Sequence, residues 1–231
     1  MTKKIAIIPA RGGSKRIPKK NIKSFLGKPI IAYAIETAFN SNLFDEVMVS
    51  TDCEDIANVA KEYGAKVPFL RSDKNSDDFA TTIDVISEVI SCYKDRDLSF
   101  EYACCIYPCT PLLNKEKLTE SFSLLLKHNL DCVFPIIRYG FPVQRAVRVN
   151  KDGVVVMIQP EHLITRSQDL EPTFHDAGQF YFFNTEKLVS KQKLLTDLTG
   201  YIELSEMEAQ DIDNLVDWKL AEVKYKLLRD L

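Results

Sequence analysis

The feature that most constrains the fold is a regular alternation of short apolar runs and longer amphipathic segments across residues 5–136. The strand-length apolar runs occupy residues 5–9, 46–51, 66–70, 102–107 and 131–136. Between these runs, apolar residues recur at helical spacing in residues 29–41, 52–64, 81–93 and 114–129. Strands that alternate with helices form mostly parallel sheets that helices cover on both faces. The sequence therefore predicts a three-layer α/β fold with a mostly parallel sheet.

Residues 138–175 break this alternation and predict an inserted arm. Their short strand-like pieces are separated by turn signals, among them the hairpin-type sequence Asn-Lys-Asp-Gly. The earlier pattern then returns with an apolar strand at 178–184 and a final amphipathic helix at 213–228. The chain thus divides into a main domain and a β-rich arm. Their predicted bounds are residues 1–137 and 176–231 for the main domain and 138–175 for the arm.

Three residues mark predicted helix ends. Asp52 and Asp213 each precede a helical pattern and are expected N-caps. Gly64 follows the second helical pattern and is its expected C-terminal stop.

Charge and composition exclude several classes of protein. The chain has 30 Lys and Arg residues against 33 Asp and Glu, so no general basic field attracts nucleic acid. No apolar stretch approaches the roughly 20 residues that a membrane span needs, and the first residues lack a secretory signal pattern. The 6 cysteines form no C-x-x-C pair and are typical of reduced core residues. We therefore expect a cytoplasmic protein without nucleic-acid or membrane partners.

A basic loop follows the first predicted strand, at the usual ligand edge of a parallel sheet. Its cations are Arg11, Lys15, Arg16, Lys19 and Lys20. Two consecutive glycines in the loop allow the backbone to approach a ligand and to present its N–H groups. The spacing matches neither a Walker A loop nor a G-x-G-x-x-G loop. The loop therefore predicts polyphosphate binding, with a solvated surface turn as the alternative.

An acidic pair near the C-terminus is the second candidate site. Asp211 and Asp213 flank Ile212, so both carboxylates project to one side of an extended segment. Two carboxylates that face one way suit a hard cation such as magnesium. A helix cap beside a solvated charge is the alternative interpretation.

Two further segments lie at predicted strand ends. Arg71 follows a short strand and could bind a phosphate or carboxylate. The alternative for Arg71 is a surface ion pair with Asp73 or Asp77. Residues 107–113 contain two prolines that stiffen the loop after a central strand. The alternative interpretation of this loop is a plain strand-to-helix turn without a role in binding.

Together these segments resemble the CMP-nonulosonic acid synthetases, the acylneuraminate cytidylyltransferase family. The resemblance covers nearly the whole chain, and its first motif, IPARGGSKRIPKKN, is highly specific. The segments that carry it follow in the family's order and spacing: residues 8–21, 49–52, 70–82, 107–113 and 211–214.

The resemblance implies transfer of CMP from CTP to the anomeric hydroxyl of a nonulosonic acid, with release of pyrophosphate. The main domain would then be a nucleotide-binding catalytic domain. Its implied nucleotide site consists of Ala10, Arg11, Gly12, Gly13, Ser14, Lys15, Lys20, Asn21, Arg71, Asp78, Ala80 and Thr81. Arg11, Lys20 and Asp211 are the implied catalytic residues, and Asp211 and Asp213 would bind Mg²⁺. Such a transfer depends on positioning and charge neutralisation, and Asp211 could also accept the hydroxyl proton.

Two segments resemble the branch of the family that activates pseudaminic acid. Where sialic acid members carry Leu-Gln-Pro-Thr-Ser-Pro, this chain has Ile-Tyr-Pro-Cys-Thr-Pro at 106–111. Residues 174–182 read Phe-His-Asp-Ala-Gly-Gln-Phe-Tyr-Phe, where sialic acid members have an Asn-Gly-Ala-type stretch. We therefore assign Tyr107, His175 and Gln179 to the sugar site.

The resemblance also implies that the arm builds a homodimer and reaches into the neighbouring site. Its candidates for contact with the sugar carboxylate of the neighbour are Arg145, Arg148, His162 and Arg166. The sequence does not assign which of them acts.

Several other functions remain open at this point. They are a sialic, legionaminic or Kdo cytidylyltransferase, and a nucleotide-binding regulator without catalysis. A phosphatase is disfavoured, because it would need a nucleophilic aspartate directly after the first strand. The favoured function requires Arg11 and Asp211 to lie on the same side of the molecule.

Overall fold

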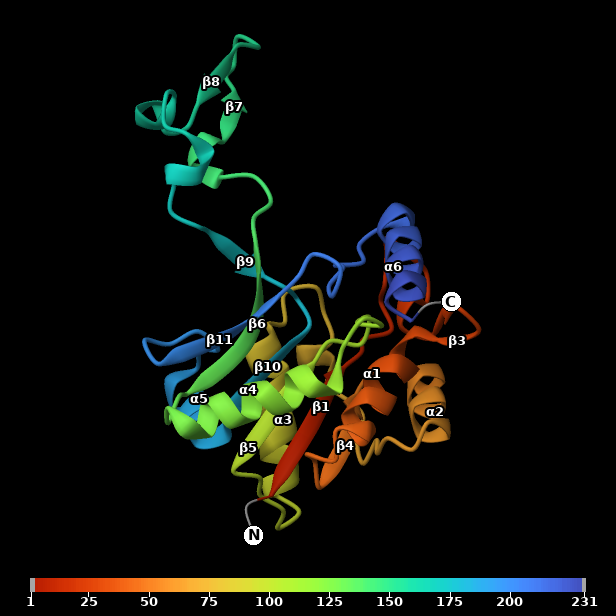
Figure 1. Ribbon diagram of the computed structural model, residues 1–231. Helices are drawn as coiled ribbons and strands as arrows, with labels where there is room; N and C mark the ends of the chain where they lie inside the picture. Colours follow the sequence, from red (N-terminus) through yellow and green to blue (C-terminus); the bar gives the residue numbers. More distant parts are fainter. Residues whose placement is uncertain (1–2, 230–231) are drawn as a thin grey trace.

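A seven-stranded mixed sheet forms the centre of the computed structural model, which describes residues 3–229 (Figure 1). The strand order is β11-β6-β10-β5-β1-β4, and β9 also pairs with β6. β1, β4, β5, β6 and β11 run parallel to one another, whereas β9 and β10 run antiparallel. The predicted mostly parallel sheet is therefore confirmed. Its strands are β1 Lys4–Pro9, β4 Glu46–Ser50, β5 Tyr102–Ile106, β6 Cys132–Arg138, β9 Phe174–Asp176, β10 Phe180–Asn184 and β11 Thr199–Leu204.

Helices cover both faces of this sheet, as the apolar strands predict. The helices are α1 Ile30–Asn40, α2 Glu54–Glu62, α3 Thr82–Lys94, α4 Lys115–Lys127, α5 Thr185–Lys191 and α6 Leu215–Leu228. Ala6 and Ile8 of β1 belong to a core cluster with α1, α2 and α4. Ile5 and Ile7 belong to the opposite cluster, with α3 and α5. Burial on both faces explains the unbroken apolar sequence of β1, because each buried isoleucine contributes about 1.5–3 kcal/mol.

A third apolar cluster lies beside α6 and joins distant parts of the chain. It contains Ile17 of the basic loop, Ile212 of the acidic pair, and Trp218 of α6. Ile17 and Ile212 are 2% and 1% exposed, so both are core residues although charged residues surround them in the sequence. The cluster also includes Phe25 of a small hairpin, β2 Ser24–Phe25 and β3 Lys28–Pro29.

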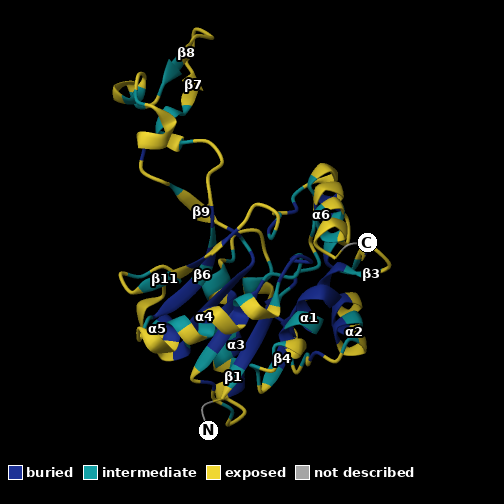
Figure 2. Cartoon of the chain, in the orientation of Figure 1, coloured by how far each residue is buried: buried dark blue, intermediate teal, exposed yellow. Residues whose placement is uncertain are grey.

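The segment between β6 and β9 projects from the body as an arm (Figure 1). Its hairpin consists of β7 Val147–Val149 and β8 Val155–Met157, joined through the predicted turn, in which Gly153 has a φ of 75°. Short 3₁₀ turns complete the arm: Val143–Arg145, Pro160–His162 and Ser167–Asp169. Figure 2 shows that most of the arm is exposed, and several of its apolar residues, such as Val149, Val155 and Ile164, are exposed as well.

Three local predictions are wrong. Residues 66–70 make a single β-bridge, at Lys66, instead of a strand. Cys53, and not Asp52, is the N-cap of α2, because Asp52 is used by the basic loop. Asn214, and not Asp213, caps α6 and accepts hydrogen bonds from the start of that helix.

The predicted C-terminal stop of α2 is confirmed. Gly64 follows α2 with a φ of 88°, in the left-handed region expected of a C-terminal stop. All 6 cysteines are free. None of the helices in residues 3–229 combines the length and apolarity that crossing a membrane requires.

Candidate active site

The basic loop leaves β1 and is held in place by polar contacts. The Gly12 N–H donates to Asp52 Oδ1 at 2.8 Å, which ties the loop to the end of β4. Asn21 is 4% exposed, and its side-chain amide donates to the Arg11 carbonyl at 2.9 Å. Cys109 Sγ in turn lies 3.2 Å from Asn21 Oδ1, at donor distance. Asn21 thus positions the loop from within.

The two glycines of the loop have different surroundings. A Cβ added to Gly12 would lie 2.9 Å from Cys53 Cβ, which is closer than packed carbon atoms come. A Cβ added to Gly13 would meet nothing within 4 Å. Gly12 is therefore required by the fold, whereas Gly13 leaves open space above the loop.

The basic loop meets the acidic pair, as the sequence predicts. Arg16 Nη1 lies 2.6 Å from Asp213 Oδ2, and Lys20 Nζ donates to the Ile212 carbonyl at 2.8 Å. The apolar contact of Ile17 and Ile212 in one cluster brings these segments together. Alternation places Ile212 inward, so the aspartates on either side of it project outward.

A cavity of about 400 Å³ opens beside the basic loop. Its lining residues are Pro9, Arg11, Ser14, Lys15, Arg16, Ile17, Lys20, Asn21, Asp78 and Pro108. Arg11 Nη1 and Lys15 Nζ lie 2.6 Å and 2.5 Å from the two carboxylate oxygens of Asp78. These hydrogen bonds, from Lys15 and then Arg11, lower the pKa of Asp78. The cavity therefore concentrates cations around one acceptor group.

The remaining predicted nucleotide residues lie around this cavity without lining it. Ala10 is buried and its N–H donates to the Ser50 carbonyl at 2.9 Å. Arg71 is also buried, and its Nε donates to Ser50 Oγ at 3.0 Å, so no surface ion pair forms. Burial lowers the pKa of Arg71. Thr81 caps α3, and the Ala80 N–H is bonded within its own loop.

A second cavity, of about 440 Å³, lies on the other side of the acidic pair. We call it the acid-pair cavity. Its lining residues are Ile137, His175, Asp176, Ala177, Gly178, Glu206, Ala209, Gln210, Asp211 and Lys224. Among the three predicted sugar residues, it contains only His175. Its position next to the basic loop would allow two ligands to meet at Asp211.

The other two predicted sugar residues lie behind the acid-pair cavity. Gln179 is 3% exposed, and its Nε2 donates to the Glu208 carbonyl at 2.6 Å. This bond fixes the loop that carries Asp211. The Tyr107 hydroxyl lies 3.1 Å from Thr82 Oγ1, at hydrogen-bond distance.

The two carboxylates of the acidic pair influence each other. Reduced solvation raises the pKa of Asp211, and the neighbouring Asp213 charge raises it further. No group of three or more His, Cys, Asp or Glu side chains with a metal-binding arrangement occurs within residues 3–229. The pair thus supplies two carboxylates, and a cation here would take further oxygen ligands from water or a bound phosphate.

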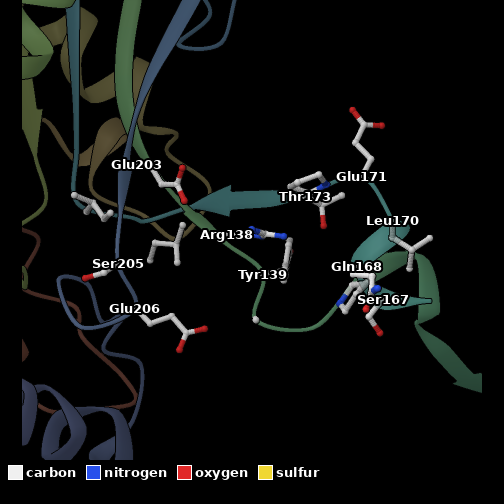
Figure 3. Close-up of a pocket in the computed structure, with 15 residues that line it drawn as sticks. Arg138, Tyr139, Ser167, Gln168, Leu170, Glu171, Thr173, Glu203, Ser205 and Glu206 are labelled. Atoms are coloured by element: carbon white, nitrogen blue, oxygen red, sulfur yellow. The ribbon is translucent and has the colours of Figure 1, made fainter. Parts of the chain in front are cut away.

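A third cavity, of about 440 Å³, lies where the arm joins the body (Figure 3). Side chains from the arm, such as Gln168, lie across it from Glu203 and Ser205 at the end of β11. The cavity shares Ile137 and Glu206 with the acid-pair cavity. The two hollows therefore adjoin at the base of the arm.

Sequence reasoning did not assign four residues of the site. Arg16 was recognised as part of the basic loop, but its contact with Asp213 could not be predicted, because the two residues lie far apart in the sequence. Asp52 could have been found, because it is the last residue of the family segment 49–52, but the sequence analysis interpreted it as a helix cap. Asp176 and Lys224 line the acid-pair cavity. Asp176 lies in the segment 174–182 that carries the resemblance, whereas nothing in the sequence around Lys224 marks it.

Comparison with known proteins agrees with this geometry. The sequence profile of the cytidylyltransferase family matches residues 5–230. The pseudaminic acid cytidylyltransferase of Campylobacter jejuni is 40% identical over 225 residues, which cover 97% of each chain. The CMP-N,N'-diacetyllegionaminic acid synthase of Legionella pneumophila is 30% identical over 94% of each chain.

A solved structure has the same fold. A CMP:2-keto-3-deoxy-manno-octonic acid synthetase complexed with CTP superposes with a TM-score of 0.71 over 100% of both chains, at 17% identity. The family profile and the identity to full-length relatives show that this chain belongs to the cytidylyltransferase family.

Proposed function

We propose that the protein transfers CMP from CTP to the anomeric hydroxyl of pseudaminic acid, with release of pyrophosphate. The single observation that carries the proposal is the meeting of the basic loop and the acidic pair between two cavities. One cavity is lined by cations, as a triphosphate requires, and the other contains a carboxylate at its edge. The Campylobacter relative supports the choice of sugar.

The basic loop would bind the phosphates of CTP. Arg11, Ser14, Lys15 and Lys20 line the cavity, and backbone N–H groups near Gly13 can be approached closely. The triphosphate would replace Asp78 as the anionic partner of Arg11 and Lys15. Fixed cations at the phosphates stabilise the charge that develops on the leaving pyrophosphate.

The transfer itself is an in-line displacement. The anomeric oxygen bonds to the α-phosphorus while the bond to the bridging oxygen breaks, and pyrophosphate leaves with that electron pair. Asp211, which lines the acid-pair cavity, would accept the hydroxyl proton at its carboxylate.

Asp211 and Asp213 would also hold Mg²⁺. Their carboxylates are hard oxygen ligands, and their mutual repulsion is relieved when a cation binds between them. Bound magnesium supplies positive charge that neutralises the phosphates. Arg16, now paired with Asp213, would then be free to contact a phosphate.

We further propose that the protein is a cytoplasmic homodimer. The exposed valines of the β7–β8 hairpin, such as Val149 at 67% and Val155 at 62%, support an interface between arms or between an arm and a second body. The free cysteines fit a reducing compartment.

Pyrophosphate release tests the proposal directly. The protein is incubated with CTP and magnesium, and offered pseudaminic, N-acetylneuraminic, diacetyllegionaminic and Kdo acids in separate reactions. Release with pseudaminic acid at the highest kcat/KM supports the proposal. Preference for another acid would change the sugar alone, and release with none would favour a nucleotide-binding regulator.

A further inference from the structure

One lysine of the acid-pair cavity is held by two backbone carbonyls, and the Glu206 carboxylate acts on it from beyond ion-pair distance. Lys224 projects from α6, and its Nζ donates to the Glu206 carbonyl at 2.7 Å and to the Ala209 carbonyl at 2.8 Å. No carboxylate within residues 3–229 forms an ion pair with it. Burial lowers the pKa of Lys224. An ammonium group has three donors, so one remains after the two carbonyl bonds.

The acids nearest to Lys224 are engaged elsewhere. The Glu206 carboxylate lies against the arm base, where a Cβ on Gly140 would be 2.7 Å from its Oε1. Asp176 accepts hydrogen bonds from the Tyr181 hydroxyl and the Gly178 N–H. A partly buried cation that is hydrogen-bonded only to neutral carbonyls gains from an anionic ligand at its remaining donor.

His175, the other basic residue of this cavity, is poorly suited to an anion. Its Nδ1 lies 2.9 Å from the Asp176 carbonyl, and a carbonyl only accepts, so Nδ1 carries the proton. That donor is therefore already used and is not available to an anion. Of the two basic residues that line this cavity, Lys224 is therefore the better placed to bind an anion.

The geometry points to Lys224 as the residue that binds the carboxylate of the acceptor sugar; this inference rests on the proposed function. In a nonulosonic acid the carboxylate is attached to the anomeric carbon, next to the reacting hydroxyl. A cation for that carboxylate must share a cavity with the proton acceptor, and Lys224 shares one with Asp211. Binding at Lys224 would turn the anomeric hydroxyl toward Asp211.

The test compares a charged acceptor with a neutral one. Steady-state kinetics are measured for the sugar acid and for its C1 methyl ester, with wild type, Lys224→Met and Lys224→Gln. A charge-assisted hydrogen bond predicts a KM for the acid that is raised by about 10- to 100-fold in both variants. The KM for CTP stays unchanged, and the preference for acid over ester disappears. Lys219→Met, on the exposed side of α6, is the matched control and behaves as wild type.

A purely structural role would give a different result. Lys224 also holds the backbone at Glu206 and Ala209, so loss of that support would lower turnover of acid and ester equally and leave their ratio intact. An intact ratio in a folded Lys224→Gln variant would overturn the inference. Wild type that turns over no nonulosonic acid would refute the proposed function instead. In that case the affinity of the CTP-loaded protein for the sugar acid is measured by calorimetry. Weaker binding to Lys224→Met and Lys224→Gln than to wild type would still support the inference about Lys224.

Discussion

Replacing Gly12 by alanine tests how closely the basic loop must approach the start of α2. The new Cβ would lie 2.9 Å from Cys53 Cβ, about 0.6–1 Å inside normal carbon contact. Such overpacking costs about 1–3 kcal/mol. If the loop shifts to relieve it, the bond from the Gly12 N–H to Asp52 lengthens and the cations move away from the phosphates. The KM for CTP would rise by about 5- to 150-fold if the whole cost appears in binding.

The cost can appear as a lower stability of the fold or as weaker binding of CTP. Thermal unfolding and CTP kinetics, measured on the same variants, separate these two effects. The contact is between Cβ atoms, so Cys53→Ala retains it and should not rescue Gly12→Ala. Cys53→Gly removes it and should rescue. Cys53 makes no side-chain cap bond, and glycine is tolerated at an N-cap. Gly13→Ala should leave stability unchanged, because its Cβ meets nothing. Rescue by Cys53→Ala, or wild-type behaviour of Gly12→Ala, would refute the steric argument.

Four further predictions concern the acidic pair, the loop, the metal and the arm. Asp211→Asn should lower turnover by about 10²–10⁴-fold yet raise the melting temperature at pH 7. The folded pKa of Asp211 is raised, so the stability gain is present above that pKa and fades as the pH falls toward 3.8. Lys20→Ala should lower kcat by about 10²-fold, whereas exposed Lys23→Ala should not. EDTA should abolish pyrophosphate release until magnesium is restored, and Asp213→Asn should raise the magnesium concentration needed for half-maximal rate. A Val149→Asp, Val155→Asp double variant should be monomeric by light scattering; a dimer of undiminished mass would exclude this hairpin from the interface.

The sequence predicts the layers of this fold well because the pattern of burial is local. An apolar run such as that of β1 has to be buried on both faces, and helices between such strands have to cover the sheet. The sequence predicts the elements at the periphery of the fold less well. β11 was not predicted, because its burial alternates with exposed residues such as Tyr201, and α5 was not predicted, because it has only seven residues. Residues 66–70 have strand composition but make only one bridge.

A site residue could be predicted where its type has one chemical use. It could not be predicted where two uses, such as capping a helix and forming an ion pair, compete for the same residue. Asp213 and Asn214 are both good N-caps, so local propensity does not choose between them. The fold chooses Asn214, because Asp213 pairs with Arg16 across the molecule. In the same way Asp52 resembles a cap by sequence but binds the Gly12 N–H.

The link between the loop and the acidic pair shows why apolar residues matter to an ionic site. The ion pair between Arg16 and Asp213 joins distant segments of the chain but is largely exposed, so it is worth about 0–1 kcal/mol. That is too little to hold the exposed charges of the two segments together against solvent. Ile17 and Ile212, both buried in one cluster with Trp218, each contribute more. Ile212→Ala should therefore loosen the acidic pair more than Arg16→Ala does. Measured as the magnesium dependence of the reaction, a larger effect of Arg16→Ala would contradict this order.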